Sequence, residues 1–299
     1  MTPPDRIAGA PITWGVCEVP GWGHQMAPER VLAEMRSLGL GATELGPEGF
    51  LPSEGARELL TAFGLRVVAG FVPAVLYEES RLDGELAAIS VAVDAIATLG
   101  GEVVVLAAST GSEGYEGRPE LDAAAWSELA RGLDRVRDLA SRRGLVVAVH
   151  PHHGTVVERP EDVDLLLQLT DVGLCLDTGH LMVGGGDPAA LAGAASARVV
   201  HVHLKDVDAA LASRVASGDL GYHEAVRSGL YRPLGDGDVD IQAVIRTLES
   251  SGYAGWYVLE HDEVLDREPA PGAGPIEGAR RSLAFLDRVW EEVGSTTGR

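Results

Sequence analysis

Short apolar runs alternate with longer amphipathic segments along the whole chain. The apolar runs are predicted to be strands and lie at Ile12–Val16, Ala42–Leu45, Arg66–Val72, Glu102–Ala108, Leu145–Val149, Val172–Leu176, Val199–Leu204 and Trp256–Leu259. Segments with helical periodicity lie between and after them, at Pro28–Leu38, Ser53–Phe63, Leu82–Leu99, Ala123–Arg142, Pro160–Leu169, Pro188–Ala197, Ile241–Ser250 and Gly278–Val293. This alternation predicts parallel strands joined by crossover helices, and eight such units close into a (β/α)₈ barrel.

Proline and glycine positions support these element boundaries. Pro28, Pro160 and Pro188 fall in the first turn of predicted helices, where the missing amide hydrogen costs nothing. Glycines follow several predicted helices, as a left-handed C-cap requires, at Gly39, Gly64, Gly100, Gly144 and Gly252. Local sequence and the periodic pattern therefore predict the same elements.

The longest irregular stretches follow strands and do not precede them. They are Pro20–Ala27, Gly111–Pro119, Ala209–Asp238 and Asp262–Pro275, after predicted strands 1, 4, 7 and 8. Long loops after strands are typical of a barrel whose catalytic face carries extra segments. A doubly wound open sheet is the alternative, but no Gly-x-Gly-x-x-Gly follows the first strand, which disfavours a dinucleotide site.

Length and charge narrow the function classes. The chain has 299 residues and a formal net charge of −21, and we expect one barrel domain over residues 1–299. An acidic protein is a poor partner for nucleic acid or for an acidic membrane surface, because both bind through lysine and arginine. Small neutral or cationic substrates and divalent cations suit the negative electrostatic field of this protein better.

Cysteine usage and the N-terminus indicate the compartment. Cys17 and Cys175 are the only cysteines, too few for a disulfide framework. The N-terminus lacks the pattern of a signal peptide, and no apolar run approaches the ~20 residues that span a bilayer. We therefore expect a cytoplasmic protein.

Histidines and acidic residues gather where the last four predicted strands end. Seven of the nine histidines lie in four stretches, namely His150–His153, Asp177–His180, His201–Asp206 and Glu260–Asp262. In a barrel the carboxyl ends of the strands converge on one pocket. Strands 5, 6, 7 and 8 would then present His150, Asp177, His203 and Glu260.

Two imidazoles and two carboxylates form a mixed nitrogen and oxygen ligand set. Such a set suits Mn²⁺, Co²⁺, Fe²⁺, Zn²⁺ or Mg²⁺. Four ligands leave positions open on an octahedral ion, and a substrate needs those positions. Beside this set stands Lys205, the only lysine among 24 basic residues. A lysine has a tunable pKa that an arginine lacks, so it is a candidate for chemistry, although a chance surface lysine is the plain alternative.

At these residues the sequence resembles the xylose-isomerase-like barrel superfamily, which includes sugar isomerases and epimerases, inosose dehydratases and an apurinic-site endonuclease. The resemblance covers nearly the whole chain and is most specific at Leu176–His180, His201–Asp206, Leu234–Gly237 and Leu259–Glu260. It implies a metal held by residues from strands 5 to 8. Those positions fall on His150, Asp177, His203 and Glu260, with Mn²⁺ or Co²⁺ as the first candidates.

Strand 5 departs from the superfamily pattern. Many members have Glu-Pro there, whereas this chain has His150-Pro151-His152-His153, so His152 or His153 could replace His150 as a ligand. A histidine cluster followed by Gly-Thr-Val-Val resembles the inosose dehydratase branch. Two further segments do so as well, Pro11–Trp14 and Glu44–Gly46. The endonuclease branch is disfavoured, because this chain has no histidines at the ends of predicted strands 2 to 4.

A metal bound to adjacent oxygens of a hydroxyketone would stabilise an enediolate. Loss of a neighbouring hydroxyl then gives dehydration, and reprotonation gives isomerisation or epimerisation. The resemblance favours a carbon–oxygen lyase that dehydrates a cyclic polyol ketone such as 2-keto-myo-inositol. The alternatives are an isomerase or epimerase acting on an unphosphorylated keto-sugar, and a barrel that binds a sugar without catalysis.

Three residues are candidates for proton transfer. His180 is the first, because the superfamily's dehydratases implicate this histidine in acid–base work, although a structural or substrate-binding role is equally open. Lys205 could donate to a leaving oxygen or pair with Asp206. Glu44, at the end of strand 2, could be a base, a substrate hydroxyl acceptor, or the partner of an arginine.

Three further residues are candidates for substrate contact. Trp14 would lie at the mouth of strand 1, where its indole could pack against a ring, or it could fill the core. His153 and Arg232 could hydrogen-bond substrate hydroxyls. Barrels of this kind often associate through the loops of the catalytic face, which makes a homodimer the expected assembly.

Overall fold

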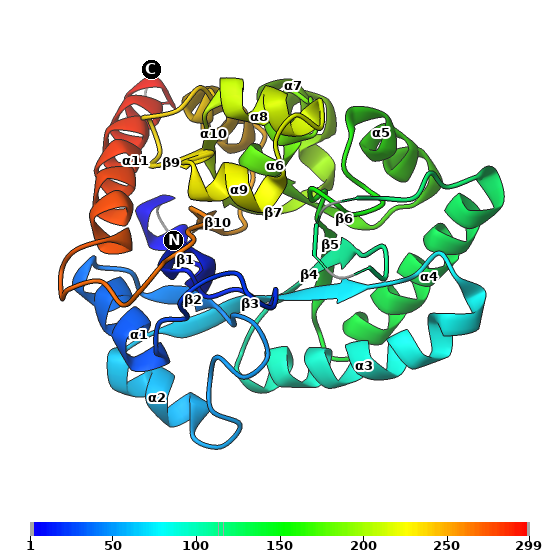
Figure 1. Cartoon of the computed structure of the whole chain (residues 1–299), viewed down its shortest axis with the longest axis horizontal. Helices are drawn as coiled ribbons and strands as arrows, with labels where there is room; N and C mark the ends of the chain where they lie inside the picture. Colours follow the sequence, from blue (N-terminus) through cyan, green and yellow to red (C-terminus); the bar gives the residue numbers. More distant parts are fainter. Residues whose placement is uncertain (1–2, 113, 116, 298–299) are drawn as a thin grey trace.

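A computed structural model describes residues 3–112, 114–115 and 117–297, which form a closed barrel surrounded by helices (Figure 1). All of its strands are parallel, and they are arranged in the order β1-β10-β7-β6-β5-β4-β3-β2, with β2 returning to β1. Their bounds are β1 Ile7–Gly9, β2 Ala42–Glu44, β3 Arg66–Ala74, β4 Val103–Ala108, β5 Val146–Val149, β6 Gly173–Asp177, β7 Val199–Leu204 and β10 Tyr257–Leu259. The predicted (β/α)₈ architecture is confirmed.

The outer layer consists of the predicted helices, with their ends shifted by a few residues. They are α1 Pro28–Ser37, α2 Ala56–Phe63, α3 Glu79–Thr98, α4 Ala123–Ser141, α5 Pro160–Leu169, α7 Pro188–Ala195, α10 Ile241–Ser250 and α11 Pro275–Thr297. Three short helices lie after the sixth and seventh barrel strands: α6 Thr178–Val183, α8 Ala209–Ala216 and α9 Tyr222–Arg227. Pro28, Pro160 and Pro188 each begin a helix, as predicted.

The prediction for the first strand was wrong. Ile12–Val16 is not a strand, since Pro11–Trp14 forms a 3₁₀ helix, η2, and the barrel strand is the preceding segment Ile7–Gly9. Small residues at Ala8 and Gly9 weaken the apolar signal of the true strand, while the bulkier residues that follow strengthen a false one. The error moves Trp14 from a strand end to a helix beyond it.

The segment after β7 contains structure that the sequence pattern did not predict. Within Ala209–Asp238, predicted to be irregular, lie α8, α9 and strand β9 (Tyr231–Arg232), which pairs antiparallel with β8 (Asp206–Val207). The Asp206 carboxylate holds the turn after β9, because it accepts hydrogen bonds from the backbone N–H groups of Gly235 at 2.8 Å and Gly237 at 3.0 Å. This insertion covers the end of the barrel where the strands finish.

Small side chains fill the lower part of the barrel interior. They form an apolar cluster with one large member, Trp256, and consist otherwise of residues such as Ala8, Ala42, Ala148 and Val258. Polar side chains occupy the interior above this cluster, toward the carboxyl ends of the strands. An interior closed by apolar residues at one end and lined by polar residues at the other places the chemistry at the catalytic face.

An ion pair below the barrel ties the chain start to α10. Both terminal guanidinium nitrogens of Arg6 are used: Nη2 donates to the Glu249 carboxylate at 2.7 and 2.9 Å, and Nη1 donates to the Tyr253 and Gly255 carbonyls. This ion pair lies beside the seam where β1 pairs with β10. Among the described residues, no helix has the length and hydropathy of a bilayer span.

Candidate functional site

Asp177, the last residue of β6, divides its carboxylate between structure and site. Its Oδ1 accepts backbone hydrogen bonds from Gly179 and His180, each at 2.8 Å, and so caps α6. Its Oδ2 points the other way and lies 3.2 Å from His150 Nε2 and 3.3 Å from Lys205 Nζ. The cap fixes the orientation of the carboxylate, so Oδ2 is held in the barrel mouth.

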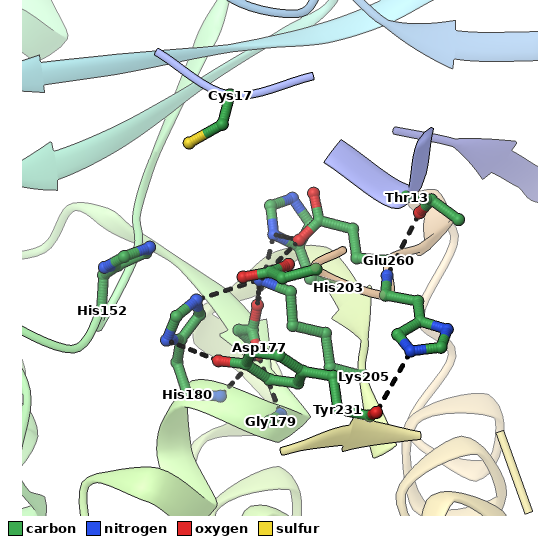
Figure 2. A network of polar contacts seen from close by, with 12 residues as sticks. Thr13, Cys17, His152, Asp177, Gly179, His180, His203, Lys205, Tyr231 and Glu260 are labelled. Atoms are coloured by element: carbon green, nitrogen blue, oxygen red, sulfur yellow. Dashed lines mark hydrogen bonds and ion pairs between the residues drawn. The ribbon is translucent and has the colours of Figure 1, made fainter. Parts of the chain in front are cut away.

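His203 lies between two of the other predicted ligands, Asp177 and Glu260 (Figure 2). Its Nδ1 is 3.5 Å from Asp177 Oδ2 and 3.2 Å from Glu260 Oε2, yet it makes no hydrogen bond and is fully buried. A buried nitrogen facing two carboxylate oxygens without a hydrogen bond is the arrangement that a cation between them would satisfy. Asp177, His203 and Glu260 therefore fit a divalent metal.

The three histidines after β5 have different surroundings. His150 is buried and contacts the site through Asp177, while the ring of His152 lies 3.7 Å from that of His180. His153 donates from Nδ1 to Glu158 at 2.8 Å and stacks on Tyr222. Of the alternatives that the sequence left open, His150 is the one placed against another predicted ligand.

Lys205 is buried among carboxylates. Its ammonium lies 2.9 Å from Glu260 Oε2, 3.1 Å from Asp262 Oδ1 and 3.3 Å from Asp177 Oδ2. Burial opposes the charged form, but these three anions raise the pKa of Lys205 well above its usual range. The alternative pairing with Asp206 is wrong, because the Asp206 carboxylate binds backbone N–H groups of its own loop.

His180 stands between the lysine and a tyrosine. Its Nε2 lies 2.9 Å from Lys205 Nζ, and its Nδ1 lies 3.4 Å from the Tyr231 hydroxyl (Figure 2). Burial, with His152 and Lys205 nearby, lowers the pKa of His180 well below its usual range, so its ring is neutral. The ammonium can only donate, so Nε2 of His180 accepts its hydrogen bond. His180 is thus a proton acceptor already in contact with a proton donor.

Glycine at position 179 allows this close arrangement. A Cβ built there would lie 2.5 Å from Cβ of Lys205 and 3.0 Å from the Tyr231 ring. Thr178 secures the same backbone, since its hydroxyl donates to the Lys205 carbonyl at 2.7 Å and accepts from the Lys205 amide at 2.9 Å. The Asp-Thr-Gly-His segment therefore packs directly against the lysine strand.

Glu44, at the end of β2, reaches across the barrel to β7. Its Oε1 accepts hydrogen bonds from His201 Nε2 at 2.8 Å and from His203 Nε2 at 3.1 Å. Burial would raise the pKa of Glu44, but the two imidazoles lower it well below the usual range. Within the described part of the chain this carboxylate pairs with two histidines and not with the arginine that the sequence allowed.

Three functional candidates were missed by the sequence argument. Asp262 binds Lys205, and its Oδ2 accepts from the Tyr222 hydroxyl at 3.2 Å; that hydroxyl lies 2.9 Å from the hydroxyl of Tyr231. Burial raises the pKa of Asp262 to about 6. Strand alternation could have indicated Asp262, two residues after Glu260, but nothing in the sequence placed the two tyrosines of the insertion.

Two predicted substrate contacts lie further from this cluster. Trp14 is fully buried, and its indole N–H donates to Glu34 of α1 at 2.8 Å. Arg232 of β9 is 41% exposed at its side chain and binds Asp208 at 3.0 Å. The placement of Trp14 favours the packing role that the sequence left as its alternative.

Aromatic side chains from separate loops lie over the site. The Trp22 ring, from the segment after η2, lies 6.3 Å from that of Tyr222 on α9, and the Tyr115 ring lies 4.5 Å from that of His152. Trp22 is also tied to the loop after β10, donating to the Glu263 carbonyl at 2.9 Å. The charged cluster below them is screened from water, which strengthens its electrostatic interactions.

The arrangement combines four elements that carbon–oxygen chemistry needs. Anionic and imidazole ligands could hold a cation, a neutral imidazole could accept a proton, an ammonium could donate one, and all of these side chains are buried. This chain was also compared with known protein families. A family model described as xylose isomerase-like TIM barrel matches residues 32–289.

Two characterised relatives match over nearly their whole length. Rhizopine catabolism protein MocC of Rhizobium meliloti is 36% identical over 298 residues, covering 97% of this chain and 90% of the relative. Inosose dehydratase of Geobacillus kaustophilus is 32% identical over 297 residues, covering 96% and 95%. These values are high enough to establish common descent.

Solved structures with the same fold are more distant in sequence. L-ribulose 3-epimerase superposes with a TM-score of 0.73 at 16% identity, covering 100% of this chain and 97% of that one. The IOLI protein with a bound zinc atom superposes with a TM-score of 0.69 at 15% identity, covering 96% and 99%. At such identities the likeness extends to the fold alone.

Proposed function

Because this chain belongs to the xylose isomerase-like TIM barrel family, we propose that it is a metal-dependent dehydratase acting on a cyclic polyol ketone such as 2-keto-myo-inositol. One observation carries the proposal: a proton acceptor, His180, and a proton donor, Lys205, touch each other at the edge of a cation site. The name of the relative from Geobacillus kaustophilus, inosose dehydratase, supports the choice of substrate. Dehydration needs both groups, because one proton leaves carbon and one joins the departing hydroxyl.

The metal would be held by His150, Asp177, His203 and Glu260. Mn²⁺ and Co²⁺ suit this mixed nitrogen and oxygen set best, with Mg²⁺, Fe²⁺ or Zn²⁺ as further candidates. When bound, a divalent ion supplies Lewis acidity that lowers the pKa of the carbon acid beside the ketone. The neutral state of His150, whose pKa burial lowers, is the state that a ligand requires.

His180 accepts the proton in this proposal. Substrate entry turns the Lys205 ammonium toward the hydroxyl that leaves, which frees the Nε2 lone pair of His180. The proton on the carbon beside the ketone passes to that Nε2, and the electron pair of the broken C–H bond forms the enediolate. The low pKa of His180 keeps its ring in the base form before this step.

Lys205 completes the elimination. The C–O bond to the β-hydroxyl breaks as the enediolate electrons form the new double bond, and the ammonium donates a proton so that water departs. Lys205 is then a neutral amine, and His180 carries the proton taken from carbon. Their 2.9 Å contact returns that proton to Lys205, so both groups are restored for the next turnover.

Epimerisation or isomerisation of an unphosphorylated keto-sugar is the alternative. The feature that favours isomerisation is that His180 alone could pass its proton to the neighbouring carbon of the enediolate, with no need for a leaving group. Epimerisation would also need a proton donor on the opposite face of the substrate. A barrel that binds a sugar without catalysis is less favoured, because it gives no reason for a buried lysine beside the cation site. These functions share a fold and differ in the fate of one intermediate.

The secondary roles are part of the proposal. His153, held by Glu158, and Arg232 would bind substrate hydroxyls at the rim, while Trp14 would support the first loop from below. Cytoplasmic location, a role in inositol catabolism and a homodimer formed through the loops of the catalytic face complete it. Sedimentation at micromolar concentration would test the dimer.

Incubation of metal-loaded protein with 2-keto-myo-inositol in D₂O separates the alternatives. Ultraviolet absorbance and mass are followed together. Dehydration gives a conjugated enol-dione chromophore and a loss of about 18 mass units, the mass of one water, as the elimination chemistry requires. Deuterium uptake without water loss would favour the isomerase or epimerase alternative. The absence of both signals would reject this substrate class.

A further inference from the structure

Glu44 makes an unusual pair of contacts in the barrel interior. One carboxylate oxygen, Oε1, accepts from Nε2 of both His201 and His203, and all three side chains are at most 5% exposed. The residues come from β2 and β7, which are separated around the barrel by β1 and β10. The Glu44 side chain therefore crosses the interior to reach the strand that carries the central metal ligand.

The contact determines which nitrogen of His203 can bind a cation. A carboxylate can only accept, so Nε2 of His203 carries the hydrogen that Glu44 receives. In the neutral ring Nδ1 then has the free lone pair, and Nδ1 is the atom that faces Asp177 Oδ2 and Glu260 Oε2 without a hydrogen bond. Glu44 thus selects the tautomer that the cation site needs.

His201 holds Glu44 in place. It lies two residues before His203 on β7, so both side chains point to the same face of the strand, into the barrel. Its contact with Glu44 is the shorter one, 2.8 Å against 3.1 Å. Its Nε2 donates to the carboxylate, and its Nδ1 has no hydrogen-bond partner among the described residues.

These contacts also weigh against Glu44 as the catalytic base. A base must lie within hydrogen-bond reach of the proton that it takes, whereas Oε1 of Glu44 is engaged by the two imidazoles of β7. The oxygen that accepts both hydrogen bonds is turned toward β7. The geometry leaves a structural task, the orientation of His203, for a residue that sequence alone suggested for proton transfer.

We propose that Glu44 is a positioning residue, anchored by His201, that binds Nε2–H of His203 and so directs Nδ1 of His203 to the metal. The proposal rests on the metal site of the proposed function and extends it to Glu44 on β2 and His201 on β7. Loss of a hydrogen-bond partner behind a metal-binding histidine lowers metal affinity about 10- to 100-fold. The expected effect is therefore on binding of the ion itself.

The test is titration of the chelator-treated protein with Co²⁺, following heat and the visible absorption of the ion. Wild type is expected to bind one Co²⁺ per chain. Glu44→Gln is expected to keep this stoichiometry with a Kd raised about 10- to 100-fold and a changed visible spectrum. The Gln carbonyl oxygen has two lone pairs for the two imidazoles, but its hydrogen bonds lack the negative charge that strengthens those of the carboxylate.

Glu34→Gln is the matched control. Glu34 is another buried glutamate with two polar partners, Trp14 and Arg30, and it lies on α1 away from the metal ligands. Its substitution is expected to leave the Kd for Co²⁺ within about twofold of wild type. An equal loss in both variants would show that any buried glutamate supports the site, and the proposal would fail.

A second pair of variants covers the case in which Glu44→Gln does not fold. His201→Gln keeps an N–H donor for Glu44 and is expected to retain the wild-type Kd, while His201→Leu removes the donor and raises the Kd. Equal affinities in this pair would overturn the proposal. So would wild-type binding of two Co²⁺ ions with one lost in a Glu44 variant, since Glu44 would then be a ligand.

The outcome is separable from that of the proposed function. Weakened Co²⁺ binding in Glu44→Gln, in a protein that does not dehydrate 2-keto-myo-inositol, would support the positioning role and reject the substrate. Dehydration by wild type, with unchanged Co²⁺ binding in the folded variant, would support the substrate and reject the positioning role. Failure of wild type to bind Co²⁺ at all would overturn both.

Discussion

Replacement of Lys205 by methionine should have opposite effects on stability and metal affinity. Methionine keeps most of the side-chain length and removes the charge, leaving three buried carboxylates without the ammonium that lies 2.9–3.3 Å from each. Removing one partner of a buried ion pair costs about 3–5 kcal/mol. With an unfolding entropy of ~2.1 cal/mol/K per residue over 299 residues, the metal-free variant should melt about 5–8 °C lower.

Metal binding should become tighter in the same variant. Lys205 contacts Glu260 Oε2 and Asp177 Oδ2, the two oxygens that also face His203 Nδ1, so ammonium and metal compete for the same negative charge. Two unit charges ~4 Å apart repel by about 4 kcal/mol at an effective dielectric constant of 20, and a divalent ion is repelled more. Even a partial release of this repulsion predicts a Kd for Mn²⁺ at least tenfold lower.

Thermal melts with and without Mn²⁺, together with calorimetric titration, measure both effects. The rise in melting temperature on adding Mn²⁺ should be larger for Lys205→Met than for wild type, and turnover should fall by roughly 10²-fold or more through loss of the donor. Arg6→Met is the control, because it breaks a buried ion pair far from the site and should lower stability alone. Equal Mn²⁺ affinity in wild type and Lys205→Met would refute the reasoning.

Three further substitutions test single residues. Glu260→Gln should abolish metal retention and activity, because it removes the negative charge of a ligand while keeping the side-chain shape. Full activity with metal bound would reject the site. His180→Asn should keep metal content and lose roughly 10²-fold in turnover, and an unchanged rate would make it structural. Trp14→Phe should cost about 1–3 kcal/mol of stability with KM unchanged, since the Glu34 carboxylate loses a buried donor; a raised KM without destabilisation would indicate substrate contact.

The barrel could be predicted because its signals are local and repeated. Strands such as Val199–Leu204 were predicted at their observed bounds, and Pro28, Pro160 and Pro188 begin helices as expected. The first strand was not found, because Ala8 and Gly9 contribute little hydrophobic signal although the barrel buries them completely or nearly so. Small residues suit the narrow interior of a barrel, and periodicity of bulky residues cannot detect them.

The site was predictable where a residue ends a strand. Asp177 and Glu260 follow apolar runs, and the barrel places their carboxylates on either side of His203. Contacts that depend on the insertion after β7 were out of reach, since no local pattern says that Tyr231 returns beside His180. The role of Glu44 also required the structure, because its partners lie on a strand across the barrel.

The central claim is that residues at four strand ends hold a metal ion on which dehydration depends. The direct test is formation of the conjugated product from 2-keto-myo-inositol by chelator-treated wild type and Glu260→Gln, before and after Mn²⁺ is added. The account predicts that neither protein forms product before Mn²⁺ is added. After addition, wild type should form product and the variant should not. Product formation by the stripped wild type, or equal recovery in Glu260→Gln, would contradict it.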